Sequence, residues 1–282
     1  MPRYFIQPKK EFHVPVDARS MSPDNIKGKS IKEILELPVW EGNSRLRLGE
    51  IFEVSCSPEP EDTVELIIDS NNKIRYVGYK MSEGRIIIEG EAGCFLGYKM
   101  KGGMIIVRGN ADSWLGSKMK DGIIEVFGNA GDHLGSKLPG EKPGKGMSGG
   151  EIIVHGSAGS YIGEGMSGGR IIVEGSSGIM PGYSMIGGSI FIRGGCNGLP
   201  GARMVKGKIV IGGVVPRILP SFHPDSVLSK GKVGKWAVTG RIFLLIGDSV
   251  VGGRGRLYLN LDLNKYLEEL AELLEVGGVE AW

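Results

Sequence analysis

Lysines recur along this chain at a fixed spacing, and they are its most distinctive candidates for chemistry. One column repeats every 19 residues, and two further lysines stand two positions after members of that column. The column is Lys80, Lys99, Lys118 and Lys137, and the two neighbours are Lys101 and Lys120. Stacked about 5 Å apart, such charges repel by roughly 1 kcal/mol per pair in water. The column is therefore either a solvated edge or a site for an extended anion, such as a polycarboxylate tail or an acidic partner surface.

Groups suited to catalysis do not converge in the sequence. The histidines lie far apart, His155 falls in a variable column typical of a solvated surface, and no metal-ligand spacing surrounds His133, which could contact a partner. The three cysteines share no motif spacing, and their odd number favours a reducing cytoplasm over a disulfide framework. Metal-binding, phosphate-binding and nucleophile motifs are also missing. We therefore expect no catalytic residue, metal site or cofactor on this chain.

Glycine is the unusual feature of the composition, with 48 of 282 residues, against about 7% in an average protein. The glycines do not recur at every third position, which excludes collagen. A hydrophobic content of 41% and a net charge of +2 argue against disorder and against nucleic-acid binding. No apolar run approaches the roughly 20 residues of a membrane span, and the N-terminus lacks the apolar segment of a secretory signal. We therefore expect a cytoplasmic protein.

The glycines belong to a 19-residue repeat, which is the element that must position the lysines. The block Gly78-Tyr79-Lys80-Met81 recurs at 97–100 and, with serine in place of tyrosine, at 116–119. Met147 follows Met119 by 28 residues, so nine residues have been inserted before the period resumes. Three further columns hold Gly84, Gly103, Gly122, Gly150, Gly169, Gly188 and Gly207; Ile86, Ile105, Ile124, Ile152, Ile171, Ile190 and Ile209; and Ile88, Val107, Val126, Val154, Val173, Ile192 and Ile211.

The alternation of these columns predicts the fold. Each Ile-x-Ile/Val segment has period two and is bounded by glycine, which indicates a short strand between tight turns. A chain that returns above itself every 19 residues makes these strands parallel, and parallel crossovers are nearly always right-handed. We therefore predict an all-β fold, a right-handed parallel β-helix (a solenoid with a 19-residue repeat). Its inward positions are the methionine column, the two Ile/Val columns, and Leu96, Leu115, Leu134 and Ile162.

The repeat divides the chain into four regions. Residues 1–63 form an N-terminal extension that caps the stack, with Ser30-x-x-Glu33 as the capping box of a helix through Leu37 and a strand at 50–56. Residues 64–213 hold the repeats, beginning with an irregular strand at 64–68 and interrupted by the insertion at 137–145. Residues 214–260 hold a proline-containing loop at 214–230 and closing strands at 236–245 and 256–259.

The fourth region, residues 261–282, contains a predicted amphipathic helix at 262–275 that Gly277-Gly278 ends. This helix either packs on the chain itself or docks on a partner. Its apolar stripe consists of Leu263, Tyr266, Leu267, Leu270, Leu273 and Leu274.

The pattern G-x-x-x-x-x-G-x-I-x-V-x-G-x-A-G resembles a glycine-repeat domain shared by glutamate synthase large subunits and by one subunit of formylmethanofuran dehydrogenase, the one designated C. We call the latter the glycine-repeat subunit. The segments 129–132, 138–142 and 146–150, which read NAGD, LPGEK and GMSGG, are similar to it. So are Ile246-Gly247-Asp248 and Gly253-Arg254-Gly255. The resemblance covers about residues 45–260. The repeat by itself identifies only the superfamily. The insertion and the C-terminal motifs make the resemblance specific to the glycine-repeat subunit.

This resemblance implies a scaffold without cofactors of its own, inside a complex that reduces carbon dioxide and formylates methanofuran in the first step of methanogenesis. It implies partner subunits that carry a tungsten or molybdenum pterin, iron–sulfur clusters and the dinuclear metal site of an amidohydrolase. Methanofuran bears a glutamate-rich tail, so the lysine column could guide that tail or an acidic face of the amidohydrolase subunit.

Three alternatives remain open at this stage. A bacterial relative of the glycine-repeat subunit belongs to a formyltransferase/hydrolase complex without a dehydrogenase. A free-standing glutamate synthase domain would work beside glutaminase and flavin subunits, although the LPGEK insertion argues against it. A plain anion-binding module would use the face of the solenoid alone.

Overall fold

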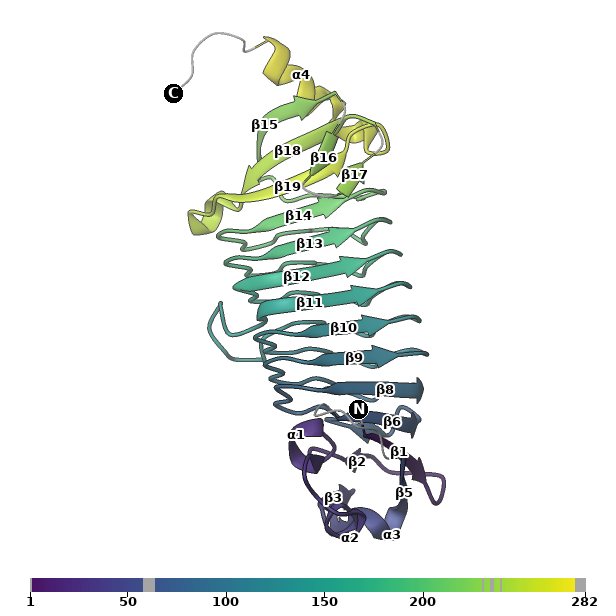
Figure 1. The fold of residues 1–282 in the computed structure, drawn as a ribbon. Helices are drawn as coiled ribbons and strands as arrows, with labels where there is room; N and C mark the ends of the chain where they lie inside the picture. Colours follow the sequence, from purple (N-terminus) through teal and green to yellow (C-terminus); the bar gives the residue numbers. More distant parts are fainter. Residues whose placement is uncertain (1, 58–63, 230, 234–235, 239, 277–282) are drawn as a thin grey trace.

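The computed structural model describes residues 2–57, 64–229, 231–233, 236–238 and 240–276. Within these residues the chain is mostly β, and its dominant feature is one 13-stranded sheet that is parallel through its centre. The strands lie one above the next along an elongated stack, with the N-terminal part at one end and the C-terminal part at the other (Figure 1). The predicted β-rich, repeat-based architecture is therefore confirmed at this level.

The parallel strands come from successive repeats, and each pairs with the next at matching positions of the repeat. They are β6 (Glu65–Ser70), β8 (Arg85–Gly90), β9 (Met104–Val107), β10 (Ile123–Val126), β11 (Ser148–Val154), β12 (Gly168–Val173), β13 (Ser189–Ile192) and β14 (Lys208–Ile211). Ile105 lies opposite Ile124, and Ile124 lies opposite Ile152 across the insertion. A second ladder of parallel bridges joins Ala92, Ala111, Ala130, Ala158, Ser177 and Cys196. Each repeat therefore contacts the next along two separate lines.

The positions predicted to face inward do form the core. Every methionine of the column, from Met81 to Met204, is fully buried, as are Leu134 and Ile162. We call the glycine column Gly78, Gly97, Gly116, Gly135, Gly163, Gly182 and Gly201 the anchor glycines. They make room for this packing: Gly97 has φ +65°, and a Cβ there would lie 2.6 Å from Cδ1 of Ile124. Glycine is thus required both by the backbone conformation and by the isoleucine of a neighbouring repeat.

The N-terminal part closes one end of the sheet. Strand β1 (Arg3–Pro8) pairs parallel with β6, and β5 (Phe52–Ser57) pairs antiparallel with β1. A smaller sheet contains β2 (Val16–Asp17), β3 (Pro38–Glu41), β4 (Ser44–Arg47) and β7 (Ile74–Arg75). The short helices are α1 (Pro23–Ile26), α2 (Ile31–Leu35) and α3 (Leu48–Ile51). The predicted capping box at Ser30 and Glu33 is present, although α2 ends two residues before the expected Leu37.

The C-terminal part closes the other end, and here two sequence predictions were wrong in detail. The loop expected at 214–230 contains a strand, β15 (His223–Leu228), which pairs antiparallel with β18 (Ile242–Gly247). Pro224 is tolerated because β15 is an edge strand with an irregular register beside it. The strand expected at 236–245 is two elements, β17 (Trp236–Val238) and β18, while β16 (Gly231–Val233) pairs with β17. Strand β19 (Gly255–Asn260), predicted at 256–259, lies between β14 and β18.

The predicted C-terminal helix begins later than expected. Short 3-10 turns occur at Ser249–Val251 and Lys265–Leu267, and α4 spans Glu268–Val276. Leu263 and Tyr266 are about half exposed, so they do not belong to its packed face. Leu267 is buried and Leu270 packs against the core, and α4 lies against β15. Of the two predicted roles, packing on its own chain is therefore the one observed, and Gly277-Gly278 lie outside the described residues.

Candidate functional site

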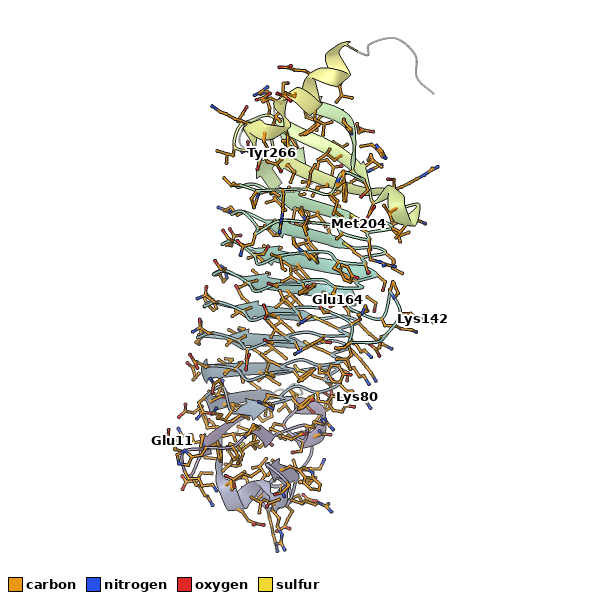
Figure 2. All side chains as sticks on the ribbon, turned by 180° about the vertical axis from the view of Figure 1, so that it is seen from behind. Glu11, Lys80, Lys142, Glu164, Met204 and Tyr266 are labelled. Carbon is orange, nitrogen blue, oxygen red and sulfur yellow. The ribbon has the colours of Figure 1, made fainter. Side chains whose placement is uncertain are left out.

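Five of the six predicted lysines line one groove. We call this surface the lysine groove; it has a volume of about 420 Å³ and is lined by Lys80, Lys99, Lys101, Lys118, Lys120, Gly144, Lys145, Gly146 and Ser148. The repeats supply five of these lysines, and the insertion adds Lys145. Lys80 and the insertion residue Lys142 lie on the same side of the molecule (Figure 2). The sequence column therefore becomes a continuous, strongly cationic surface.

The backbone of the lysine column has an uncommon conformation. Lys80, Lys99 and Lys118 have φ values of 57°, 60° and 58°, in the left-handed region. A non-glycine residue pays roughly 1–2 kcal/mol for this conformation. Gly165, which stands at the equivalent position one repeat beyond Lys137, avoids that cost. Ser184 and Arg203, at the equivalent positions of later repeats, have φ values of 53° and 58°, so this conformation belongs to the turn of the repeat and not to lysine in particular.

Tyrosine rings lie beneath two of these lysines. The Nζ atom of Lys80 is 5.0 Å from the ring centre of Tyr79, and the Nζ atom of Lys99 is 5.1 Å from that of Tyr98. The two rings stack with centroids 5.9 Å apart. Cation–π contacts of this kind contribute about 0.5–1 kcal/mol at exposed sites. They favour positions of the Lys80 and Lys99 ammonium groups over these two rings.

The insertion forms a wall of the lysine groove and places a carboxylate against it. Glu141 pairs with Lys118, and its Oε2 accepts a hydrogen bond of 2.9 Å from the backbone N–H of Leu138. Burial alone would raise the pKa of Glu141, but hydrogen bonds from Lys118 and the Leu138 N–H bring it below its ordinary value. The N–H groups of Gly144 and Gly146 donate to the carbonyl of Gly165 at 2.9 and 3.0 Å. Glu141 thus supplies a carboxylate to one lysine of the groove, Lys118.

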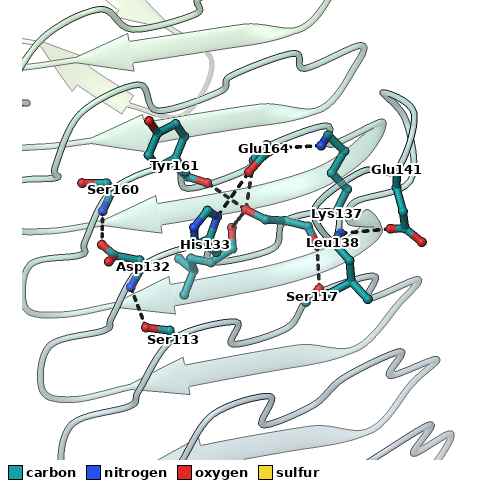
Figure 3. Close-up of polar contacts among 12 residues, drawn as sticks. Ser113, Ser117, Asp132, His133, Lys137, Leu138, Glu141, Ser160, Tyr161 and Glu164 are labelled. Carbon is teal, nitrogen blue, oxygen red and sulfur yellow. Dashed lines mark hydrogen bonds and ion pairs between the residues drawn. The ribbon is translucent and has the colours of Figure 1, made fainter.

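Lys137 departs from the prediction because it does not line the lysine groove. It is only 8% exposed, and its Nζ atom lies 2.7 Å from Oε1 of Glu164. Figure 3 shows Lys137 reaching to Glu164, with His133 on the other side of the same carboxylate. The Nδ1 atom of His133 is 3.2 Å from Oε2 of Glu164, close enough for an ion pair but without hydrogen-bond geometry. Lys137 is therefore an internal structural charge and is not available to a ligand.

An aromatic column beside the lysines was not predicted from the sequence. We call the stacked rings of Tyr76, Phe95, Trp114, His133 and Tyr161 the aromatic ladder. Neighbouring ring centroids are 4.2–5.7 Å apart, and the planes differ by no more than 13°. The signal was present in the sequence, because each ring stands two residues before an anchor glycine. His133 is a member of this stack, and nothing places it in a catalytic arrangement.

No family model matches the chain. A search of curated proteins finds the subunit designated C of molybdenum-containing formylmethanofuran dehydrogenase 1 from Methanothermobacter thermautotrophicus, 38% identical over 90 residues. It also finds the subunit of the same designation in tungsten-containing formylmethanofuran dehydrogenase 2 from Methanothermobacter wolfeii, 38% identical over 99 residues. Over these segments the chain is similar to the glycine-repeat subunit of formylmethanofuran dehydrogenase.

These two matches cover 32% and 34% of this chain, and the chain spans only 22% and 36% of the length of those curated relatives. The subunits of the molybdenum and the tungsten enzyme are both 38% identical to this chain, so sequence identity does not indicate which metal type it resembles more.

A solved structure matches far more of the chain than these two sequences do. It is a chain in the formyltransferase/hydrolase complex of Methylorubrum extorquens, crystallised with methylofuran. The TM-score is 0.77 at 26% identity, covering 91% of this chain and 99% of the other. The structural similarity therefore covers nearly the whole of a chain from a formyltransferase/hydrolase complex.

The structure also tests the expectation for His155. His155 is exposed, pairs with Glu125 at 2.8 Å and stacks on Phe127, as expected of a surface histidine. Over the described ranges, no three His, Cys, Asp or Glu residues lie together as metal ligands. In the same ranges, no helix has the length and apolar character of a membrane span.

Proposed function

We propose that this chain is the glycine-repeat subunit of a formylmethanofuran dehydrogenase complex, a non-catalytic structural component folded as a right-handed parallel β-helix. The proposal assigns carbon dioxide reduction and formylation of methanofuran to other subunits, in the cytoplasm. Those partners would be an amidohydrolase subunit with a dinuclear metal site, pterin-binding subunits with tungsten or molybdenum, and iron–sulfur subunits. The observation that supports it most is the identity to the glycine-repeat subunits of such enzymes, together with the regular stacking of repeats described above.

The second candidate is the equivalent subunit of a formyltransferase/hydrolase complex. It is favoured by one observation, the structural match over nearly the whole of a chain from such a complex. In both candidates the chain is a scaffold, and in both the lysine groove has the same role. We propose that the groove holds an anionic segment of the carrier cofactor, methanofuran or its analogue, close to the partner that acts on it.

The charge and shape of the lysine groove support this role. Six lysines converge on one cavity, and one of them, Lys118, already pairs with the carboxylate of Glu141. An extended chain of carboxylates would relieve the repulsion between neighbouring ammonium groups, which is roughly 1 kcal/mol per pair in water. An acidic face of the amidohydrolase subunit would satisfy the same charges and is the other occupant to be tested.

Purification of the tagged chain from its native host identifies the complex. Tungsten or molybdenum together with iron–sulfur subunits would support the dehydrogenase. A formyltransferase without these metals would support the second candidate. A chain that purifies alone, without other subunits, would contradict both and leave an anion-binding module.

The role of the groove is tested by Lys99→Glu combined with Lys101→Glu, which leaves the Lys118–Glu141 pair intact. A matched control is Lys206→Glu, because Lys206 is exposed but does not line the groove. Affinity for methanofuran reduced at least tenfold in an assembled complex supports a cofactor-tail site. Loss of assembly supports an acidic partner surface. Unchanged affinity and assembly, matching the control, would overturn the proposed groove function.

A further inference from the structure

A second cavity lies at the N-terminal end of the lysine groove. We call it the ring pocket; its volume is about 440 Å³, and Arg19, Ser20, Pro38, Trp40, Tyr79 and Lys80 contribute to its lining. Lys80 lines both cavities. The pairing of β2 with β7 brings the N-terminal residues to the first repeat. A ligand that follows the lysines toward the N-terminal part therefore arrives at this pocket.

The walls of the ring pocket are planar groups. Trp40 is 44% exposed, although it is a large apolar side chain. The guanidinium of Arg19 lies 5.6 Å from the ring centre of Tyr79 and 4.2 Å from that of Tyr76, the first ring of the aromatic ladder. Indole, phenol and guanidinium surfaces all bind flat rings by stacking. Leu37 and Pro38 add apolar area to the same walls.

The polar groups of the ring pocket argue against a simple cation site. Its two carboxylates are already engaged, since Asp17 pairs with Arg19 at 3.3 Å. Asp24 accepts hydrogen bonds from the backbone N–H of Ser82 at 3.0 and 3.2 Å. By contrast, the hydroxyl oxygen of Ser20 is buried and has no hydrogen-bond partner in the described part of the chain. A buried hydroxyl without a partner is costly, and Ser20 is one of the residues that line the ring pocket.

We propose that the ring pocket binds a planar ring carried by the same anionic chain that the lysine groove holds. This inference rests on the proposed groove function. The ligand class is an extended polycarboxylate with an aromatic or heteroaromatic group at one end, which stacks on the exposed ring of Trp40. The carboxylates nearest the ring pair with Lys80 and then with Lys99. The ring fixes the register and direction of the chain, which a row of equivalent lysines alone would leave undefined.

The test uses fluorescence anisotropy on the full chain with labelled hexaglutamate and with hexaglutamate that carries one tyrosine, placed at either end. We expect one tyrosine-bearing peptide to bind at least fivefold more tightly than hexaglutamate. Trp40→Ala should abolish this preference and change the affinity for plain hexaglutamate less than twofold. Trp40→Phe should retain the preference, and Phe127→Ala, at an exposed ring elsewhere, should leave it unchanged.

The outcomes separate the two proposals. If no peptide binds, the groove function fails, and the ring pocket fails with it. If all peptides bind equally and Lys99→Glu weakens them all, the groove function stands and the ring pocket is refuted. If the preference survives Trp40→Ala, the ring binds elsewhere and the ring pocket is again refuted.

Discussion

Replacing Lys137 with alanine should destabilise the chain by about 3–5 kcal/mol, because removing one partner of a buried ion pair leaves the other charge uncompensated. The side chains of Lys137 and Glu164 are only 10% and 11% exposed, and their charged atoms are 2.7 Å apart. The stem of Lys137 also packs closely, since a Cβ on Gly165 would lie 2.6 Å from its Cδ. The nearest group that could compensate Glu164 is His133, at 3.2 Å.

Thermal unfolding followed by circular dichroism measures this effect. A chain of this size shifts its midpoint by about 2 °C per kcal/mol when it unfolds in one transition, so Lys137→Ala should lower it by about 6–10 °C. Glu164→Gln should have an effect of similar size. The double variant Lys137→Met with Glu164→Gln should recover much of the loss, because replacing both partners of a buried pair is often close to neutral.

The control is Lys142→Ala, at an exposed lysine of the insertion, which should change stability by less than about 0.5 kcal/mol. A loss below about 1 kcal/mol in Lys137→Ala would refute the reasoning. So would a double variant whose loss equals the sum of the two single losses, since the two residues would then act independently.

Two further predictions concern titratable groups. Burial opposes ionisation of Asp248, but hydrogen bonds that include the N–H groups of Arg203 and Val250 lower its pKa below 3.8. Asp248→Asn should therefore lower the free energy of unfolding by about 1–2 kcal/mol at pH 7. In urea unfolding, this difference should shrink as the pH falls below 3.8, because the wild-type carboxylate then takes up its proton. A difference that does not change with pH would contradict the prediction. Burial and a hydrogen bond to Asp112 raise the pKa of Cys94 to about 11. Mass spectrometry at pH 8 should find its alkylation by iodoacetamide about 100-fold slower than that of a free thiol, and equal rates would show that the thiol is not so held.

The sequence predicted the centre of the fold because the repeat encodes it redundantly. A strand at 123–126 is specified by its own alternation and also by the matching columns on both sides. The C-terminal part has no such redundancy. Pro224 there argued for a loop, and the pairing with β18 that makes it an edge strand is not visible in the local sequence. The start of α4 shifted for the same reason, since Leu263 and Tyr266 have the helical spacing but not the burial.

The candidate site was predicted in the same uneven way. The column of lysines indicated one cationic surface, and five of its six predicted members line the groove. Lys137 could not be separated from the others by spacing, because its pairing with Glu164 and its packing against Gly165 involve the next repeat. The ring pocket was invisible because Arg19 and Trp40 precede the repeat and reach it only through the pairing of β2 with β7.

The antiparallel strands at the two ends of the large sheet have a consequence for self-association. Strand β19 covers the edge of β14, and β1 covers the edge of β6. Without these end strands and the strands beyond them, β14 and β6 would expose unpaired backbone groups that match each other. A stack whose top matches its bottom adds copies of itself head to tail and grows into an open-ended fibre. Reversing strand direction at both ends breaks that match. The repeat that makes the stack easy to extend within one chain therefore does not meet a matching repeat at either end of the sheet.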